Sequence, residues 1–283
     1  MKLASFSVAG QHSYGIVRHD GVVDAGRRLG AKYPTLLDVL SADALAEVVA
    51  VDTAAQKADH AVADVAFSIP ITAPGKIICI GRNYRDHVLE GAGEMPKQPS
   101  VFIRTLDSFA PPGEALICPR VSGNFDYEGE LALVIGKGGR HIPAAAALQH
   151  IAGYTLLNDG SIRDYQFGHS LIVGKNFYRS GSIGPSMTTS DEISDPTALT
   201  LMTRLNGQEV QHATTDHLIF DIPFLIQYLS AVFELVPGDI IATGTPEGVG
   251  FARKPPLWMK AGDVIEVEIA GIGTLRNTVV AEG

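Results

Sequence analysis

Short apolar runs separated by turns fill most of the chain from residue 73 onward and restrict its fold more than any other feature. The runs are rich in β-branched residues, which favour strands, and glycine and proline mark turns at VPGD (236–239) and KAGD (260–263). We predict strands within KIICIG (76–81), SVFIRT (100–105), EGELALVIG (128–136), AGYTLLND (152–159), LTLMTRLNG (199–207), DIIATGT (239–245) and DVIEVEIAG (263–271). The last run begins a predicted closing hairpin with Ile265, Val267 and Ile269 inward. This part of the chain is therefore predicted to be predominantly β.

One helix stands out in this β-rich region, and it begins near Asp221. Ile222, Leu225, Ile226 and Leu229 recur at the spacing of one helical face. The surrounding stretch 220–236 carries Asp, Pro, Gln and Glu, so we interpret it as a helix of a water-soluble protein and not as a membrane span. AAAALQHI (144–151) is a candidate second helix.

The N-terminal residues predict a separate, small α+β domain. ASFSVAG (4–10) and YGIVRHDGVVDAG (14–26) are typical of short strands, with Asp20-Gly21 forming a hairpin turn. TLLDVL (35–40) and ADALAEVVA (42–50) predict short helices, and the alanine-rich stretch 52–72 predicts a connector. We therefore divide the chain into a small domain with its connector, 1–72, and a larger β-rich domain, 73–283.

Charge and cysteine content exclude several classes of protein. The 283 residues carry a formal net charge of −9 and no run of Lys or Arg, which argues against nucleic-acid or anionic-membrane partners. Cys79 and Cys118 lie far apart in apolar surroundings, so we expect two free thiols in a reducing compartment. The N-terminus lacks the apolar core of a signal peptide. We expect a cytoplasmic location.

Acidic residues lie on one face of an otherwise apolar predicted strand. Side chains two residues apart share a face, so Asp126, Glu128 and Glu130 would repel one another unless something compensates their charge. Gly129 leaves the opposite face open to close backbone approach. With Asp159 at the end of another apolar run, the carboxylates suit a hard cation, Mg²⁺ or Mn²⁺, with Ca²⁺ as an alternative. An exposed strand face without a metal is the competing interpretation.

Further candidate residues could act on a substrate. His87 and Glu90 are three apart, and on a helical turn the carboxylate could orient the imidazole as a base; a solvated surface pair is the alternative. Lys175 follows Gly174, although an isolated lysine is usually exposed. ATGTPEGVG (242–250) could present hydroxyl and N–H groups to an anion, or form a plain turn. The sequence has no HExxH, Walker or GxGxxG motif.

Taken together, these segments resemble the fumarylacetoacetate hydrolase family, in particular its acylpyruvate hydrolases. The resemblance is carried by KIICIGRNYRDHVLE, FDYEGELALVIG, AGYTLLNDGSIRDYQ, GKNF, PGDIIATGTPEGVG and GDVIEVEIAGIGTLRN, in the family's order. It implies a mixed β-roll or sandwich domain, a homodimer and a divalent metal. It also implies roles for individual residues: metal ligands Glu128, Glu130 and Asp159; a catalytic group His87, Glu90 and Lys175; and substrate contacts Arg163, Gln166 and Thr245.

The resemblance implies that a bound metal compensates Glu128 and Glu130, while Asp126 is not a family ligand and is expected to face solvent. Some residues depart from the family pattern. Arg104 stands where lysine is common, and Gly160, Ser161 and Tyr178 also differ; all are expected near the pocket. These departures leave the identity of the substrate open.

The chemistry implied by the resemblance is hydrolytic C–C cleavage of an acylpyruvate-like 1,3-diketo acid. His87, oriented by Glu90, would activate water, and the metal with Lys175 would stabilise the departing enolate. Decarboxylation of a 2-oxo diacid such as oxaloacetate and enol–keto isomerisation would use the same site, and the sequence does not separate these reactions. A non-catalytic, metal-stabilised β-domain is the alternative from a different class.

Overall fold

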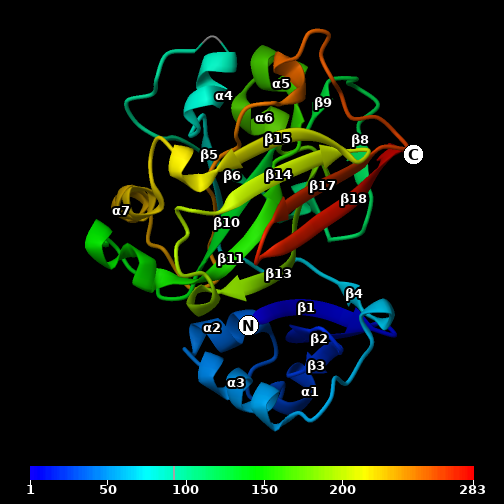
Figure 1. The fold of residues 1–283 in the computed structure, drawn as a ribbon, viewed down its shortest axis with the longest axis vertical. Helices are drawn as coiled ribbons and strands as arrows, with labels where there is room; N and C mark the ends of the chain where they lie inside the picture. Colours follow the sequence, from blue (N-terminus) through cyan, green and yellow to red (C-terminus); the bar gives the residue numbers. More distant parts are fainter. Residues whose placement is uncertain (92) are drawn as a thin grey trace.

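The computed structural model describes residues 1–91 and 93–283, and its main element is an 11-stranded sheet. The strands are β1 (Lys2–Val8), β2 (Gln11–Arg18), β3 (Gly21–Asp24), β4 (Ala66–Phe67), β5 (Ile77–Gly81), β6 (Ser100–Arg104), β7 (Phe109–Ala110), β10 (Gly129–Ile135), β11 (Ile151–Asn158), β13 (Gly181–Thr189) and β16 (Ile240–Ala242). Their order is β3-β2-β1-β13-β11-β10-β16-β5-β6, with β4 on β1 and β7 on β13 (Figure 1). The sheet therefore brings β10 and β11 together at its centre.

A second sheet covers β10 and β11. It contains β8 (Leu116–Cys118), β14 (Thr200–Leu205), β15 (Gln208–Thr214), β17 (Val264–Ile269) and β18 (Gly273–Ala281), in the order β15-β14-β17-β18-β8. Apolar side chains from both sheets form one buried cluster, with Leu131 and Leu156 from the first sheet and Leu201, Val267 and Leu275 from the second. The predicted α+β, predominantly β sandwich is confirmed.

At Gly129 the two sheets approach each other closely. A Cβ atom at this position would lie 2.2 Å from Thr203 Oγ1 on β14 and 3.2 Å from Val267 Cγ1 on β17. Thr203 and Val267 are buried, so neither can move away into solvent. The glycine between the two glutamates is therefore required by packing, as the sequence predicted.

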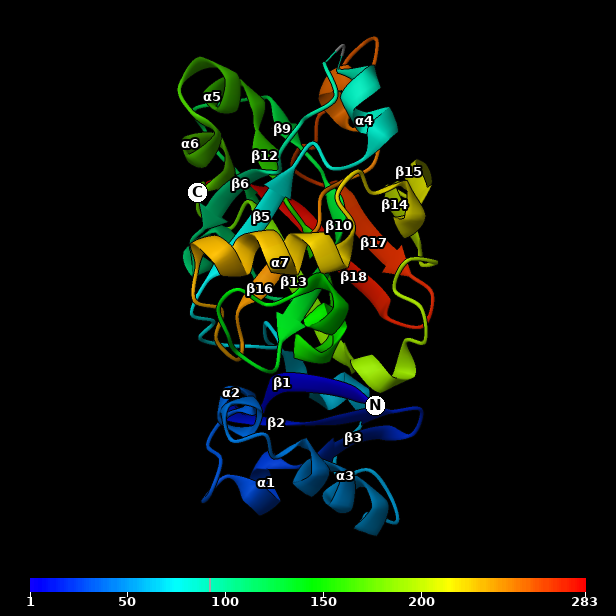
Figure 2. The ribbon, with the colours of Figure 1, turned by 90° about the vertical axis from the view of Figure 1, so that its left-hand side faces the viewer.

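The helices lie outside the sheets. They are α1 (Gly26–Leu29), α2 (Leu36–Ser41), α3 (Leu45–Ala54), α4 (Arg85–Glu90), α5 (Arg163–Gly168), α6 (Leu171–Lys175) and α7 (Ile222–Val232). In α7, the Asp221 side chain accepts a hydrogen bond from Phe224 N, and the predicted stripe is buried, so this helix is confirmed (Figure 2). Of the residues that the structure describes, none belongs to a helix that is both long and apolar enough to cross a membrane.

Short 3₁₀ helices complete the elements. They span Val62–Asp64, Leu106–Ser108, Ala144–His150, Ser190–Glu192, Thr215–His217 and Gly250–Ala252. The candidate helix at 144–151 is thus a 3₁₀ helix. Only Ala147 in it is buried, so the segment has no continuous apolar face to stabilise an α-helix.

The N-terminal residues form the predicted hairpin and helices at one end of the molecule (Figure 1). His19 and Asp20 join β2 to β3, so the turn lies one residue before the predicted Asp20-Gly21, and Gly21 begins β3 with a φ of 139°. β1 also pairs antiparallel with β13, so the large sheet continues from this part into the rest of the chain. The division at residue 72 stays a prediction. Cys79 and Cys118 are free, as predicted, although Cys118 is only half-buried.

Among the longer strands, β13 and β15 were not predicted, and the short strands β4, β7, β8 and β12 were not predicted either. β13 has the sequence GSIGPSMTT, in which Gly, Ser and Pro replace the apolar alternation that marks a strand. It forms because β1 and β11 pair with it on either side, which sequence pattern alone does not reveal.

Replacing Gly129 with alanine should lower the free energy of unfolding by about 1–3 kcal/mol, because the new methyl group overpacks the contact with Thr203. Urea denaturation of the unmodified protein and of Gly129→Ala measures the loss. Gly123→Ala is the matched control, since a Cβ at Gly123 would have no atom within 4 Å. Equal stability of Gly129→Ala and the control variant would contradict the packing argument.

Candidate active site

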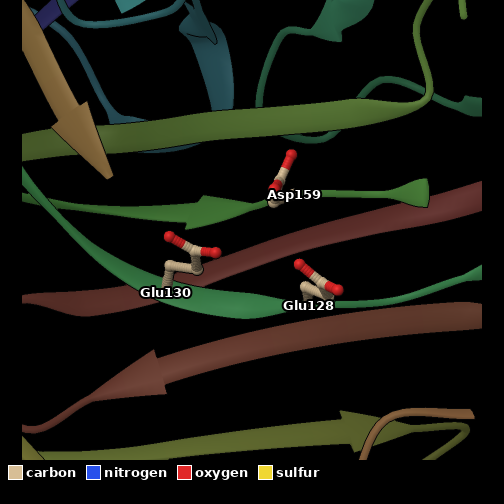
Figure 3. Close-up of side chains that lie close together, drawn as sticks. All are labelled: Glu128, Glu130 and Asp159. Carbon is tan, nitrogen blue, oxygen red and sulfur yellow. The ribbon is translucent and has the colours of Figure 1, made fainter. Parts of the chain in front are cut away.

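Three buried carboxylates meet where β10 begins and β11 ends. Glu130 lies in β10, Glu128 precedes the strand, and Asp159 follows β11. Gly129 is paired with Asn158 across the two strands, and Asp159 N donates to Glu128 O at 2.7 Å, so the acids are cross-strand neighbours. One oxygen from each carboxylate lies within 4.8 Å of the others (Figure 3). The predicted ligand set is therefore brought together.

Basic side chains compensate two of these carboxylates directly. Lys175 Nζ lies 2.6 Å from Glu128 Oε2 and 2.7 Å from Asp159 Oδ2. Arg163 Nη2 lies 2.6 Å from Glu128 Oε1, and Arg104 Nη1 lies 2.6 Å from Asp159 Oδ1. Burial opposes ionisation of Glu128, but Lys175 and Arg163 outweigh it and lower its pKa to about 2. Glu128 is therefore a carboxylate anion at neutral pH.

Glu130 lacks such compensation among the described residues. Its Oε2 accepts a hydrogen bond from Gly244 N at 2.8 Å. Burial, followed by the neighbouring Asp159 and Glu128, raises the pKa of Glu130 well above its usual range. A divalent cation between the carboxylates would remove this destabilisation. Oxygen-only donors are the ligands that Mg²⁺ and Mn²⁺ prefer, so the residues present fit such an ion.

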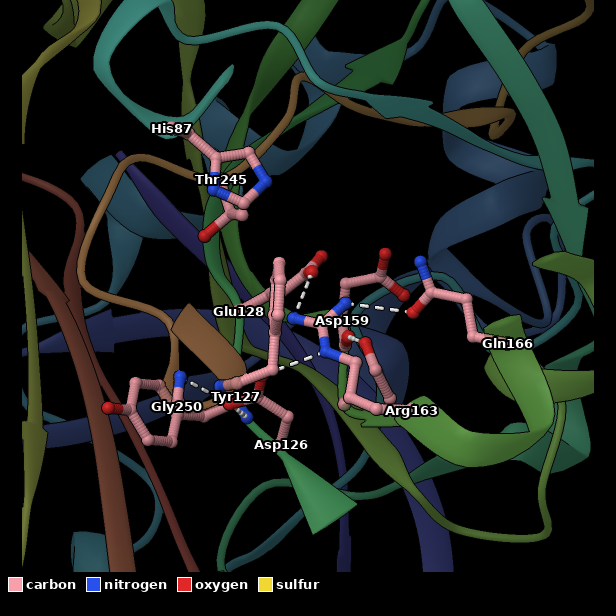
Figure 4. Close-up of polar contacts among 12 residues, drawn as sticks. His87, Asp126, Tyr127, Glu128, Asp159, Arg163, Gln166, Thr245 and Gly250 are labelled. Atoms are coloured by element: carbon pink, nitrogen blue, oxygen red, sulfur yellow. Dashed lines mark hydrogen bonds and ion pairs between the residues drawn. The ribbon is translucent and has the colours of Figure 1, made fainter. Parts of the chain in front are cut away.

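Asp126 does not face solvent, and the prediction that it does is wrong. Its side chain is fully buried and accepts hydrogen bonds from Gly250 N at 2.7 Å, Phe251 N at 3.0 Å and Arg163 Nε at 2.8 Å. The cause is a small separate sheet, in which β9 (Phe125–Asp126) pairs with β12 (Ser161–Ile162). Arg163 directly follows β12, so its guanidinium lies beside Asp126 (Figure 4).

Arg163 connects Asp126 to the ligand set and to Gln166. Its Nη2 pairs with Glu128, and its Nη1 donates to Gln166 Oε1 at 2.8 Å. Arg163 and Gln166 lie three residues apart on α5, which places them on the same side of the helix. The guanidinium is therefore held on several sides, and it in turn fixes the side chain of Gln166.

His87 and Glu90 form a hydrogen-bonded pair on α4. His87 Nδ1 lies 2.8 Å from Glu90 Oε1, and Glu90 Oε2 accepts a hydrogen bond from Gly248 N at 2.9 Å. When Nδ1 carries the proton that it donates to Glu90, Nε2 keeps a free lone pair. Figure 4 shows the His87 ring beside Thr245, on the other side of the opening from Gln166. The pair can therefore act as an oriented base.

A cavity of about 490 Å³ lies between these groups. Its polar lining includes His87, Glu128, Arg163, Gln166, Lys175 and Thr245, and its apolar lining includes Ile80, Val88, Phe102, Phe167, Leu171 and Phe251. Glu90 contacts the lining residue His87, and Asp159 contacts Lys175. The structure thus gathers all of the predicted site residues around one cavity, while their chemical roles remain proposals.

The side chains of Thr245 and Lys175 are buried, and hydrogen bonds fix them, which the sequence did not show. The Thr245 hydroxyl donates to Gly129 O at 3.0 Å and accepts from Gln211 Nε2 at 2.8 Å. Lys175 ends α6 and is buried, so the usual exposed position of an isolated lysine does not apply. Gln211 was not predicted, because it lies on the unpredicted strand β15.

Of the residues that depart from the family pattern, Gly160, Ser161 and Tyr178 do not line the cavity. Tyr178 is 59% exposed, and the prediction that it lies at the pocket is wrong. Glycine at position 160 allows the backbone to pass close to Ser180, because a Cβ there would lie 1.8 Å from Ser180 O. Arg104 does reach the site, through Asp159. Its side chain is buried, and a buried charge needs an acidic partner, which Asp159 supplies.

The family described as "Fumarylacetoacetate (FAA) hydrolase C-terminal" matches residues 76–280. The chain belongs to the fumarylacetoacetate hydrolase family. The match includes every residue of the candidate site and begins just before β5, so strands β1 to β4 of the large sheet lie outside it. The resemblance inferred from the sequence is thereby confirmed at the level of the family.

Members of the fumarylacetoacetate hydrolase family similar to this chain carry several activities in their names. Human "Oxaloacetate tautomerase FAHD2A, mitochondrial" is 40% identical over 220 residues, covering 77% of this chain and 70% of that protein. A fumarylacetoacetate hydrolase from Exiguobacterium antarcticum is 34% identical, with a TM-score of 0.86 and full coverage of both chains. Maleylpyruvate hydrolase from Sphingobium sp. SYK-6, in complex with manganese(II) and pyruvate, is 29% identical, with a TM-score of 0.83 and full coverage of both.

These relatives identify the chain as a member of a family of enzymes that includes hydrolases, isomerases and tautomerases. A manganese ion is bound by one relative, which agrees with the oxygen-ligand site found here. The human relative is named as mitochondrial. The cytoplasmic location and the homodimer predicted for this family member stay predictions.

Replacing Asp126 with alanine should destabilise this family member by about 3–5 kcal/mol, because Arg163 would lose a buried partner. Chemical denaturation with a chelator present measures the effect without a metal contribution. Glu268→Ala removes the partner of Arg204 in an exposed pair and should cost less than about 1 kcal/mol. Similar losses in both variants would contradict a structural role for the buried pair.

Replacing Glu130 with glutamine should weaken Mn²⁺ binding by at least about tenfold, because the site loses a negative charge and an anionic ligand. Titration calorimetry with Mn²⁺ alone measures this loss. Glu90→Gln is the control, since Glu90 contacts His87 and lies outside the ligand set. Unchanged Mn²⁺ affinity in Glu130→Gln would show that the three carboxylates do not form the metal site.

Proposed function

We propose that the chain is a divalent-metal-dependent enzyme that interconverts the enol and keto forms of a 2-oxo acid. The observation that carries the proposal is the His87–Glu90 pair, with a Nδ1 to Oε1 distance of 2.8 Å, beside a cavity that also exposes Glu128 and Lys175. A positioned base and a concentrated positive charge are what removal of a proton next to a carbonyl requires. The human relative named an oxaloacetate tautomerase supports this choice of reaction over hydrolysis, which the sequence favoured.

His87 would carry out the proton transfer. In the keto-to-enol direction, Nε2 of His87 would accept a proton from C3 of the substrate, the C3–H electron pair would form the C2–C3 double bond, and the C2=O π pair would move to the C2 oxygen. That oxygen would take a proton from water, and the hydroxide left behind would accept the proton from Nε2, which restores the neutral imidazole. The reverse direction returns the proton from Nε2 to C3. Glu90 keeps Nδ1 protonated and stabilises the charged imidazole that forms.

The remaining groups would bind and orient the substrate. A divalent cation held by Glu128, Glu130 and Asp159 would supply Lewis-acid stabilisation of the substrate oxygens. The Lys175 charge, fixed by Glu128 and Asp159, would add to the positive potential at the same oxygens. The Phe102 and Phe251 side chains limit water in the cavity, which strengthens these interactions.

Hydrolytic C–C cleavage of an acylpyruvate is the second candidate. The relative named maleylpyruvate hydrolase aligns over the full length of this chain and was captured with manganese and pyruvate. In that reaction His87 would remove a proton from water, and the attacked bond would break to release an acid and an enolate. The two candidates therefore share the base and differ in the atom from which it takes the proton.

An ultraviolet assay of enol loss with oxaloacetate, acetylpyruvate and maleylpyruvate separates the candidates when pyruvate, carboxylic acid and CO₂ are quantified. Mn²⁺ or Mg²⁺ is supplied, and a chelator is the control. Chelator-sensitive loss of oxaloacetate enol without pyruvate or CO₂ is the result expected for the tautomerase. Pyruvate with a carboxylic acid would identify the hydrolase, and CO₂ from oxaloacetate would identify a decarboxylase. No chelator-sensitive change in any of the three would overturn the proposal.

His87→Ala should lower kcat by about 10²–10⁴-fold while Mn²⁺ binding stays unchanged, because the base is lost and the carboxylate ligands remain. Steady-state kinetics and Mn²⁺ titration on the same preparation check both parts. Glu90→Gln should give a smaller loss, since the imidazole remains but is held less well. Full activity in His87→Ala would exclude His87 as the base.

A further inference from the structure

Arg82 lines the active-site cavity and has no acidic partner among the described residues. Its Nη2 donates to Glu94 O at 2.8 Å, which satisfies part of the guanidinium without neutralising its charge. The other arginine and the lysine of the lining, Arg163 and Lys175, each pair with Glu128. Arg82 is therefore the cationic lining side chain whose charge remains available to a ligand.

The backbone at Arg82 is held in a conformation that does not favour arginine. Its φ of 57° lies in the left-handed region, where glycine would be favoured. The chain is fixed on both sides: Gly81 pairs with Ser100 in the sheet, and the Asn83 side chain bonds Phe220 O, Phe220 N and Thr243 O. This rigid backbone directs the side chain at position 82, so an arginine here needs a reason other than local structure.

A substrate with a second carboxylate would need a cationic partner in the cavity, and Arg82 could supply it. Ile80, Val88, Phe102, Phe167, Leu171 and Phe251 are apolar, and a second carboxylate of a substrate would find no partner among them. The carboxylate set, Lys175 and His87 are already assigned to the reacting 2-oxo acid end in the proposed function. A guanidinium can bind a carboxylate through two parallel hydrogen bonds.

We propose that Arg82 binds the second carboxylate of the substrate and makes the enzyme selective for dicarboxylic 2-oxo acids. The proposal rests on the proposed function and specifies its substrate class. A net charge of −9 would disfavour the approach of a dianion, so an uncompensated cation in the cavity also improves capture of such a substrate.

The test compares oxaloacetate, which has the second carboxylate, with pyruvate, which lacks it. Enol loss gives kcat and KM for oxaloacetate, and competitive inhibition of that assay gives Ki for pyruvate. Arg82→Ala should raise KM for oxaloacetate by about 10–100-fold, the range expected for losing a charged hydrogen bond, and leave Ki for pyruvate within about twofold. Arg82→Lys should restore part of the loss, because lysine keeps the charge without the paired geometry.

Two further variants separate this role from general effects. Arg85→Ala removes an exposed cation that does not line the cavity and lies three residues further along the chain, in α4. This variant should leave KM for oxaloacetate and Ki for pyruvate unchanged. Arg82→Gly relieves the left-handed backbone, so it should raise KM for oxaloacetate as Arg82→Ala does while Tm stays equal or rises.

The outcomes are distinct. A rise in KM for oxaloacetate with unchanged Ki for pyruvate supports the assignment. Equal changes in KM for oxaloacetate and Ki for pyruvate, or no change in either, would overturn the role of Arg82. The proposed tautomerase activity would stand in both cases. If the wild-type enzyme does not accelerate loss of oxaloacetate enol, the proposed function fails, and the failure lies outside Arg82.

Discussion

Buried carboxylates that require compensation are the constraint on which the rest of this structure depends. Four of them are gathered at the ends of β10 and β11, and one more acid than base is present among the described side chains: Asp126, Glu128, Glu130 and Asp159 face Arg104, Arg163 and Lys175. Isolated buried charges cost several kcal/mol each, so this arrangement is stable only as a set. A divalent cation held by the carboxylates would more than offset this single excess negative charge, and the site would then attract an anionic substrate. The compensation of these acids therefore links the proposed metal site to the stability of the sandwich.

Asp126 extends this dependence to parts of the chain far from the metal ligands. It accepts hydrogen bonds from the N–H groups of Gly250 and Phe251 and from the guanidinium of Arg163. One carboxylate therefore fixes the 3₁₀ helix Gly250–Ala252 and the side chain at the start of α5. Phe251 in turn forms part of the cavity wall. The carboxylate that contacts Arg163 beside the proposed metal ligands therefore also fixes part of the cavity wall.

Sequence reasoning succeeded where local pattern and structure agree. Periodicity predicted the apolar strands, the helix α7 and the proximity of Glu128 and Glu130, and spacing on a helical turn predicted the His87–Glu90 contact. The position of Lys175 beside the acids was implied by the family resemblance. Sequence reasoning failed where long-range pairing decides. Strand β13 lacks a strand-like pattern and exists because β1 and β11 bind its edges. Asp126 is buried because β9 pairs with β12, a contact between segments more than thirty residues apart whose register no local pattern reveals.

The same base can serve a tautomerase or a hydrolase, so the residues that remove the proton do not decide the reaction. His87 Nε2 takes a proton from whichever atom lies in front of it, carbon C3 or a water molecule. That atom is selected by how far the substrate extends and where its distal group is anchored. Arg82 lines the same cavity as His87, and its backbone is fixed next to the sheet pairing of Gly81 with Ser100, so it is the side chain that we propose as this anchor. Selectivity for the distal group would then be set by a residue separate from the base that moves the proton.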